Sequence, residues 1–157
     1  MNLLFPTGNQ KNDMKSTNSL NEDIYQQCKK IIQPEVSQKL MGWIFRVLLN
    51  KSIEDKLFFT ETYHNKILGF SLCRLLKRTN VISIDKIGVD IKYRNQGIGT
   101  TLISRIKELG YDIKLDVVTE NHTAINFYLK NGFTIIGTKT LGKSIEVTIM
   151  KYINQII

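Results

Sequence analysis

The chain has 157 residues, of which 42% are hydrophobic and 23% charged, and this composition is typical of one globular domain with a buried core. Its formal net charge is +8, but the lysines and arginines are scattered without a basic tract, so a nucleic-acid partner is only weakly favoured. The sequence has no export signal and no apolar run of about twenty residues, and we therefore expect a cytoplasmic protein without a membrane contact.

Cys28 and Cys73 are the two cysteines, and they fall in no metal-binding or redox spacing. Cysteine is among the residues most often found in protein cores, so we expect two reduced thiols and no disulfide. The sequence predicts no metal site.

Residues 1–19 are predicted to be a flexible leader, because residues 7–19 are polar without sustained periodicity, and residues 3–5 would form at most a short edge strand. We expect a single domain over residues 20–157. Its first elements are predicted to be a helix over residues 20–32 and a second helix that starts near Pro34. The apolar stripe of the second helix is predicted to contain Val36, Leu40, Trp43, Ile44, Val47 and Leu48.

The pattern changes to β near residue 57. Strands are predicted over residues 57–63, 67–76 and 81–89, and the polar segments 64–66 and 77–80 are predicted to be turns. These elements form a three-stranded meander.

Helices and strands then alternate towards the C-terminal side. The predicted elements are a helix over 98–109, a strand over 113–119, a helix over 123–131 and strands over 133–137 and 144–152. A strand, a helix and a strand in succession predict a right-handed crossover between parallel neighbours. The fold class is therefore α/β (α+β), with a mixed, mostly antiparallel sheet.

The most informative segment is Arg94-Asn95-Gln96-Gly97-Ile98-Gly99, between a predicted strand and a predicted helix. Two glycines spaced by one residue let the backbone curve closely around a ligand, and the helix start directs N–H groups and a positive dipole end at it. A pyrophosphate suits such a loop. Leu102 occupies the position of the third small residue of a dinucleotide-binding turn, and no Gly-Lys-Ser/Thr follows, so both common nucleotide-binding loops are excluded.

Residues 87–103, IGVDIKYRNQGIGTTLI, resemble the acetyl-CoA motif of the GNAT superfamily of N-acetyltransferases, including its Arg-x-x-Gly-x-Gly core. Residues 121–133, NHTAINFYLKNGF, resemble the following motif of that family, in which Asn, Ala, Tyr and a terminal Gly-Phe recur at this spacing. The motifs are nearest to those of ribosomal-protein alanine N-acetyltransferases. The resemblance implies a GNAT fold, with a central splayed pair of parallel strands and about four flanking helices.

The resemblance also implies acetyl-CoA as the co-substrate, bound mainly by backbone groups. The backbone of Val89 and Ile91 would bind the pantetheine, and Gly88 is expected to lie in a bulge beside it. N–H groups around the pyrophosphate would come from Arg94, Asn95, Gln96, Gly97, Ile98, Gly99 and Thr100. Asn121 would contact the cofactor or cap a helix, and Lys130 would reach a CoA phosphate or remain solvated.

Three residues are catalytic candidates by resemblance. Tyr128 would protonate the departing thiolate, with a packed core tyrosine as the alternative. Asp116 falls where ribosomal-protein alanine N-acetyltransferases carry a glutamate, and Asp85 falls where many other members carry one. Either would act as the base, directly or through a water, and a structural ion pair is the alternative for each. His64 and His122 are predicted to be a turn residue and a helix-start residue.

The acceptor is predicted to be a primary amine that receives the acetyl group directly in a ternary complex. A protein α-amine, with a pKa of about 7.7 to 8.0, demands less of a base than a lysine at about 10.4, so the α-amine is slightly favoured. A lysine, a small amine, an antibiotic and an aminoacyl-tRNA remain as alternative acceptors. A non-catalytic CoA-binding sensor is the alternative to an enzyme, and a monomer and a homodimer are both compatible with the sequence.

Overall fold

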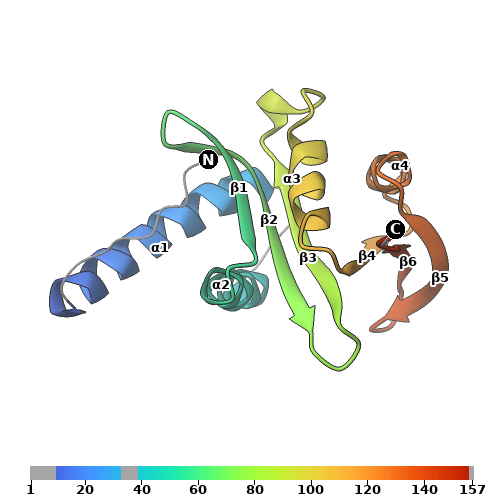
Figure 1. The fold of residues 1–157 in the computed structure, drawn as a ribbon, viewed down its shortest axis with the longest axis horizontal. Helices are drawn as coiled ribbons and strands as arrows, with labels where there is room; N and C mark the ends of the chain where they lie inside the picture. The colour runs from blue at the N-terminus through green and yellow to red at the C-terminus, as the bar shows by residue number, and fades with distance from the viewer. Residues whose placement is uncertain (1–9, 33–38, 156–157) are drawn as a thin grey trace.

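The computed structural model describes residues 10–32 and 39–155 as a sheet flanked by helices (Figure 1). The elements in chain order are α1 (Gln10–Ile32), α2 (Lys39–Glu54), β1 (Phe58–Tyr63), β2 (Lys66–Leu76), β3 (Val81–Val89), the short 3-10 helix η1 (Ile91–Tyr93), α3 (Ile98–Lys107), β4 (Asp112–Val118), α4 (His122–Lys130), β5 (Thr134–Leu141) and β6 (Ile145–Tyr152). In these described ranges, no helix combines the length and the apolar character needed to cross a bilayer.

The six strands form one sheet in the order β1-β2-β3-β4-β6-β5. Neighbouring strands are antiparallel except for β3 and β4, which are parallel and are joined through α3. The mixed sheet, the meander and the parallel pair are therefore confirmed. His64 and Asn65 both have positive φ, as a tight hairpin turn requires, so the predicted turn between β1 and β2 is confirmed as well.

Alternation along β2 divides the core between the two faces of the sheet. Phe70 and Leu72 point to one face, where they pack with residues of α1 and α2 such as Cys28 and Leu49. Cys73 points to the other face and belongs to a second cluster with residues of α3, β4 and α4, including Tyr128. The first cluster is called the α1/α2 core below, and the second the α3/α4 core.

Helix α1 begins at Gln10 instead of near residue 20, so the structure places residues 10–19 of the expected leader in a helix. This segment contains no glycine or proline to interrupt a helix, and its polar composition gives no apolar period that would reveal one. The expected strand at residues 3–5 and the helix start near Pro34 lie outside the described residues.

Helix α2 buries a face that shares only Leu48 with the described part of the predicted stripe. Trp43 is 63% exposed and Val47 is 47% exposed, whereas Phe45 and Leu49 are buried in the α1/α2 core. Apolar residues cover most of the circumference of this helix, so its sequence contains two overlapping stripes and periodicity does not decide between them. Ser52 settles the orientation, because its hydroxyl donates to Leu57 O at 2.7 Å and accepts from Cys73 N at 3.2 Å. The side chains of Val36 and Leu40 lie outside the described part of the chain.

The bulge in β3 lies at Asp85, not at Gly88 as expected. Leu72 pairs with Lys86 while its neighbour Cys73 pairs with Ile84, so Asp85 is the extra residue. Gly88 pairs regularly with Phe70 and has another role. A Cβ there would come within 3.1 Å of Ile31, so this glycine lets the end of α1 approach the sheet.

Candidate active site

Strands β3 and β4 pair only at their beginnings, through Val81 with Asp112, Ile82 with Ile113 and Ser83 with Lys114. Beyond these three pairs, β3 continues to Val89 and β4 to Val118 without pairing with each other. The two strands therefore diverge, and the space between them is called the splay below. Backbone groups that border a splay need other partners, which a bound ligand is able to supply.

A short loop connects the splayed end of β3 to α3. Asp90 fixes its start: a carboxylate oxygen of Asp90 accepts from Lys92 N at 3.0 Å, and Asp90 N donates to Leu68 O at 2.8 Å. The hydrogen bond from Lys92 N holds the pKa of Asp90 below its usual value. Arg94 then folds back, and its Nε donates to Val89 O at 3.1 Å. The loop is thus pinned against the end of β3.

The start of α3 has the features of an anion site. Gly97 is its N-cap, with φ of 84°, and no side chain caps the first turn. The leading N–H groups of the helix are therefore available to a ligand, and the positive end of the helix dipole lies beside them. Asn95, Gln96 and Gly97 are exposed, so a phosphate group is able to approach from solvent.

Gly99 places α4 against this loop. A Cβ at Gly99 would lie 3.0 Å from two ring atoms of Phe127, so the absence of a side chain permits the close approach of α3 and α4. Tyr128 follows Phe127 and is 6% exposed in the α3/α4 core, where its ring meets Phe133 edge-on at a centroid distance of 5.5 Å. Burial raises the pKa of Tyr128 above its usual value, and the neighbouring Cys73 adds to the effect.

Both candidate bases are ion-paired. Asp85 accepts from Arg74 Nε at 2.5 Å and from Arg74 Nη2 at 2.7 Å, and its side chain is only 9% exposed. Asp116 lies 2.5 Å from Lys139 Nζ and is one third exposed. These contacts fit the structural alternative for each acid, and they also hold both carboxylates in defined positions.

The candidate acid and the candidate bases lie on opposite faces of the splay. Ile84 and Leu115 point into the α3/α4 core with Tyr128, and the next residue of each strand is a candidate base. Since side chains alternate along a strand, Asp116 points to the other face. Arg74 follows Cys73 on β2, so its side chain points away from the α3/α4 core. Asp85 lies on the same face as Arg74, because its carboxylate accepts a hydrogen bond from the Arg74 guanidinium.

The remaining predicted residues lie around α4 and the loop. Asn121 caps α4, with its side-chain oxygen accepting from Ala124 N at 3.1 Å. Lys130 is exposed in the last turn of α4, and Ile91 is 75% exposed in η1. His122 is exposed at the start of α4, as expected. Over the described ranges, no three His, Cys, Asp or Glu side chains come close enough together to hold a metal ion.

Comparison with known proteins identifies the family. Residues 20–133 match the sequence profile described as the Acetyltransferase (GNAT) family. The chain belongs to the GNAT family. It is also 33% identical over 106 residues to an uncharacterized N-acetyltransferase from Methanocaldococcus jannaschii, a match that covers 61% of this chain and 46% of the relative. The chain thus spans about half the length of this relative.

Solved structures of GNAT proteins have the same arrangement of helices and strands. A Bacillus anthracis protein named as a streptothricin acetyltransferase, solved with acetyl-coenzyme A, is 31% identical, with a TM-score of 0.56 over 62% of this chain and 61% of that one. Ard1 from Thermoplasma volcanium is 25% identical, with a TM-score of 0.66 over 86% and 91% of the two chains. The ribosomal-protein-S18-alanine N-acetyltransferase from Escherichia coli is 17% identical, with a TM-score of 0.61 over 96% and 94%, and shares the fold.

Sequence reasoning missed the cations that pair with the two candidate bases. Arg74 is eleven residues from Asp85 and Lys139 is twenty-three from Asp116, and each pair forms only when the strands are aligned in the sheet. Scattered basic residues carry no local signal of such pairing. The loop, Tyr128 and the two acids remain predicted site residues, and motif spacing places them on elements that the sequence predicts.

Proposed function

We propose that this chain is an acetyl-CoA-dependent N-acetyltransferase that transfers the acetyl group directly to a primary amine. The observation that carries the proposal is the splay, with an uncapped helix start at one end, a buried tyrosine on one face and two carboxylates on the other. Two substrates are able to meet in such a site from opposite faces of the sheet. Family membership and the bound acetyl-coenzyme A of the Bacillus anthracis protein support this function.

Acetyl-CoA would be held mainly by backbone groups. Its pyrophosphate would accept N–H groups from the loop and the first turn of α3, contributed by Arg94, Asn95, Gln96, Gly97, Ile98, Gly99 and Thr100. The backbone of Val89 and Ile91 would bind the pantetheine, and the cofactor supplies the thioester to be attacked. Asn121 and Lys130 are further candidate contacts at α4, where the cap geometry of Asn121 leaves its amide nitrogen available.

Tyr128 would act as the general acid. Its raised pKa keeps the phenol protonated at neutral pH, so it has a proton to give to the departing thiolate. Asp85 and Asp116 would receive the proton of the amine, directly or through a water. Arg74 and Lys139 already form ion pairs with these two carboxylates. An acceptor amine that is partly neutral at pH 7 needs less help from a base, and it therefore suits the site best. We therefore favour a protein N-terminal α-amine.

An antibiotic or another small amine is the second candidate acceptor. It is favoured by the 31% identity to the protein named as a streptothricin acetyltransferase. Both cysteines are free and buried, which suits a reducing compartment, and we propose a cytoplasmic location for either activity.

Labelled acetyl-CoA and three acceptors test the proposal. The acceptors are a mixture of peptides with free N-termini, the same peptides blocked at the N-terminus but carrying lysine, and streptothricin. We expect label on the free N-termini, with kcat/KM rising to a plateau near pH 8, about the pKa of an α-amine.

Label on streptothricin alone would replace the α-amine with the second candidate, and label on the blocked peptides alone would identify lysine as the acceptor. Acetyl-CoA binding without transfer to any of these acceptors, or to amines of a whole-cell lysate, would identify a CoA-binding sensor instead. An absence of acetyl-CoA binding would contradict the proposal as a whole.

A further inference from the structure

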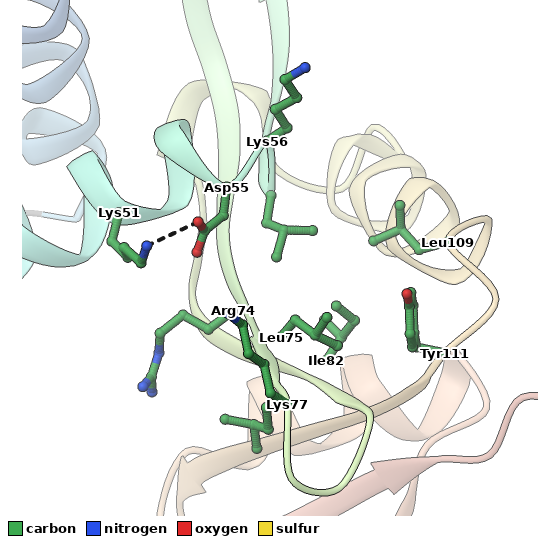
Figure 2. A pocket seen from close by; sticks show the side chains of 11 residues that line it. Lys51, Asp55, Lys56, Arg74, Leu75, Lys77, Ile82, Leu109 and Tyr111 are labelled. Atoms are coloured by element: carbon green, nitrogen blue, oxygen red, sulfur yellow. Dashed lines mark hydrogen bonds and ion pairs between the residues drawn. The ribbon is translucent and has the colours of Figure 1, made fainter.

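A pocket lies at the end of the sheet away from the loop of residues 90–97, which is called the phosphate loop below. Figure 2 shows the side chains that line this pocket. It has a volume of about 570 Å³, within the range of about 300 to 1,000 Å³ that is usual for small-ligand sites. Its walls come from the end of α2, the start of β1, the β2–β3 hairpin and the connection from α3 to β4. The lining residues are Lys51, Asp55, Lys56, Leu57, Arg74, Leu75, Leu76, Lys77, Ile82, Leu109 and Tyr111.

This pocket is separate from the acetyl-CoA site. The phosphate loop precedes the first turn of α3, whereas Leu109 and Tyr111 follow its last turn. A helix of ten residues separates the two ends by about 15 Å. A ligand in the pocket would therefore bind independently of the pyrophosphate.

The pocket combines an apolar wall with a cationic rim. Figure 2 shows Leu109 and Tyr111 facing Leu75 and Ile82 across the cavity, with Lys51 and Asp55 at one side. Leucine, isoleucine and tyrosine together supply six of the eleven lining residues. Such a surface favours the apolar body of an organic molecule over a bare inorganic ion.

The charges at the rim favour an anion. Four lining residues are cationic and one, Asp55, is acidic. Lys51 is paired with Asp55 at 3.0 Å and Arg74 with Asp85, which lies outside the pocket. Lys77 is exposed and takes part in none of the ion pairs found in the described part of the chain, so its charge is uncompensated.

We propose that this pocket binds a small amphipathic organic anion, with its apolar body against Leu75, Leu109 and Tyr111 and its carboxylate beside Lys77. Charge and shape complementarity both point to this class of ligand. A cation of the same shape would meet the uncompensated charge of Lys77, and a small hydrophilic anion would leave the apolar wall uncovered.

Octanoate is a suitable probe, and calorimetry at low salt with the full chain measures its binding without reference to acetyl transfer. Acetate has the charge without the apolar body, and octylammonium has the body with the opposite charge. We expect octanoate to bind at least about tenfold more tightly than either, and to shift the backbone amide resonances of Leu57 and Tyr111. Saturating acetyl-CoA should leave its affinity unchanged.

Lys77→Glu should weaken octanoate binding by about tenfold or more, since it places a carboxylate beside the proposed anion. Lys143→Glu is the matched control: it makes the same charge change in the exposed turn between β5 and β6, outside the pocket, and should have little effect. The proposal is overturned if octanoate does not bind at about 10 mM, if octylammonium binds equally well, if acetyl-CoA displaces octanoate, or if the two variants weaken it equally.

Discussion

Tyr128 carries the proton in the proposed reaction, and its surroundings explain why it is suited to that task. The ring is buried between Phe127 and Phe133, so the neutral phenol is stabilised relative to the phenolate. Tyr128→Phe should lower kcat by about a hundredfold to ten-thousandfold, because the thiolate would leave without its acid. The affinity for acetyl-CoA should not change, and steady-state kinetics together with equilibrium binding measures both quantities.

Tyr152→Phe is the control, since Tyr152 also packs against Phe133 but belongs to β6. It should leave kcat within about twofold of the parent, because it removes no proposed proton donor. The raised pKa of Tyr128 has a further consequence: its protonated form persists above the ordinary value of about 10, so kcat should not fall from about pH 8 to about pH 10. An equal loss in both tyrosine variants would show that Tyr128 acts through packing alone.

Cys28 and Cys73 should be inert in the folded protein. Burial raises the pKa of each thiol to about 12, so little of the reactive thiolate is present at pH 8. Iodoacetamide should modify neither cysteine in the native state and both after unfolding in guanidinium, as mass spectrometry would show. Rapid native modification of either thiol would mean that its part of the core opens readily.

Contacts between side chains that are distant in the sequence could not be predicted from the sequence alone. Asp85 and Asp116 were recognisable from the family resemblance, but their cations were not recognisable. Arg74 faces Asp85 because the β2–β3 hairpin aligns them, and the bulge at Asp85 shifts that alignment by one residue. The spacing of Ile84 and Ile87, which pack on the same face, reflects the bulge, but it does not show which cation will lie beside Asp85.

Helices α3 and α4 pack against each other beside the proposed cofactor site, and two glycines shape this unit in different ways. Gly97 needs a positive φ of 84° but has open space around it, whereas Gly99 is helical and lacks space because of Phe127. Gly97→Ala should cost about 1 to 2 kcal/mol through backbone strain, and Gly99→Ala about 1 to 3 kcal/mol through overpacking. Urea unfolding of both variants measures these free energies.

A second substitution separates the two causes. Phe127→Leu makes room beside Gly99 and should reduce the free-energy cost of Gly99→Ala, but it should leave the cost of Gly97→Ala unchanged. Equal costs of Gly99→Ala in both backgrounds would contradict the contact between α3 and α4.

The helices differ in how far their sequences determine them. In α3, Leu102, Ile103 and Ile106 form one apolar face between a glycine start and a glycine stop, and the helix was predicted nearly as observed. In α2, apolar residues cover most of the circumference, and the buried face is decided by Ser52 and the sheet. Tertiary contacts therefore determine which face of α2 is buried, whereas the periodicity of its sequence does not.

The molecule as a whole should be stabilised by acetyl-CoA, because the ligand binds the folded state alone. At a hundred times the dissociation constant the gain is about 2.7 kcal/mol, which corresponds to a rise in Tm of about 5 to 10 °C for a chain of this size. Differential scanning fluorimetry measures the shift. Acetyl-pantetheine lacks the pyrophosphate and should give little shift at the same concentration, since it makes no contact with the start of α3. Equal shifts from both ligands would remove the phosphate loop from the binding site.

The short ladder between β3 and β4 also has a mechanical consequence. Three residue pairs of the β3–β4 ladder, together with packing in the α3/α4 core, join the two halves of the sheet, so beyond Ser83 the two strands make no backbone pairs with each other. An extended ligand there would act as a surrogate strand. Amide protons of β3 beyond Ser83 that face the gap should exchange rapidly with deuterium in the free protein and become protected when acetyl-CoA is present. The cofactor would then complete the sheet that the polypeptide leaves open.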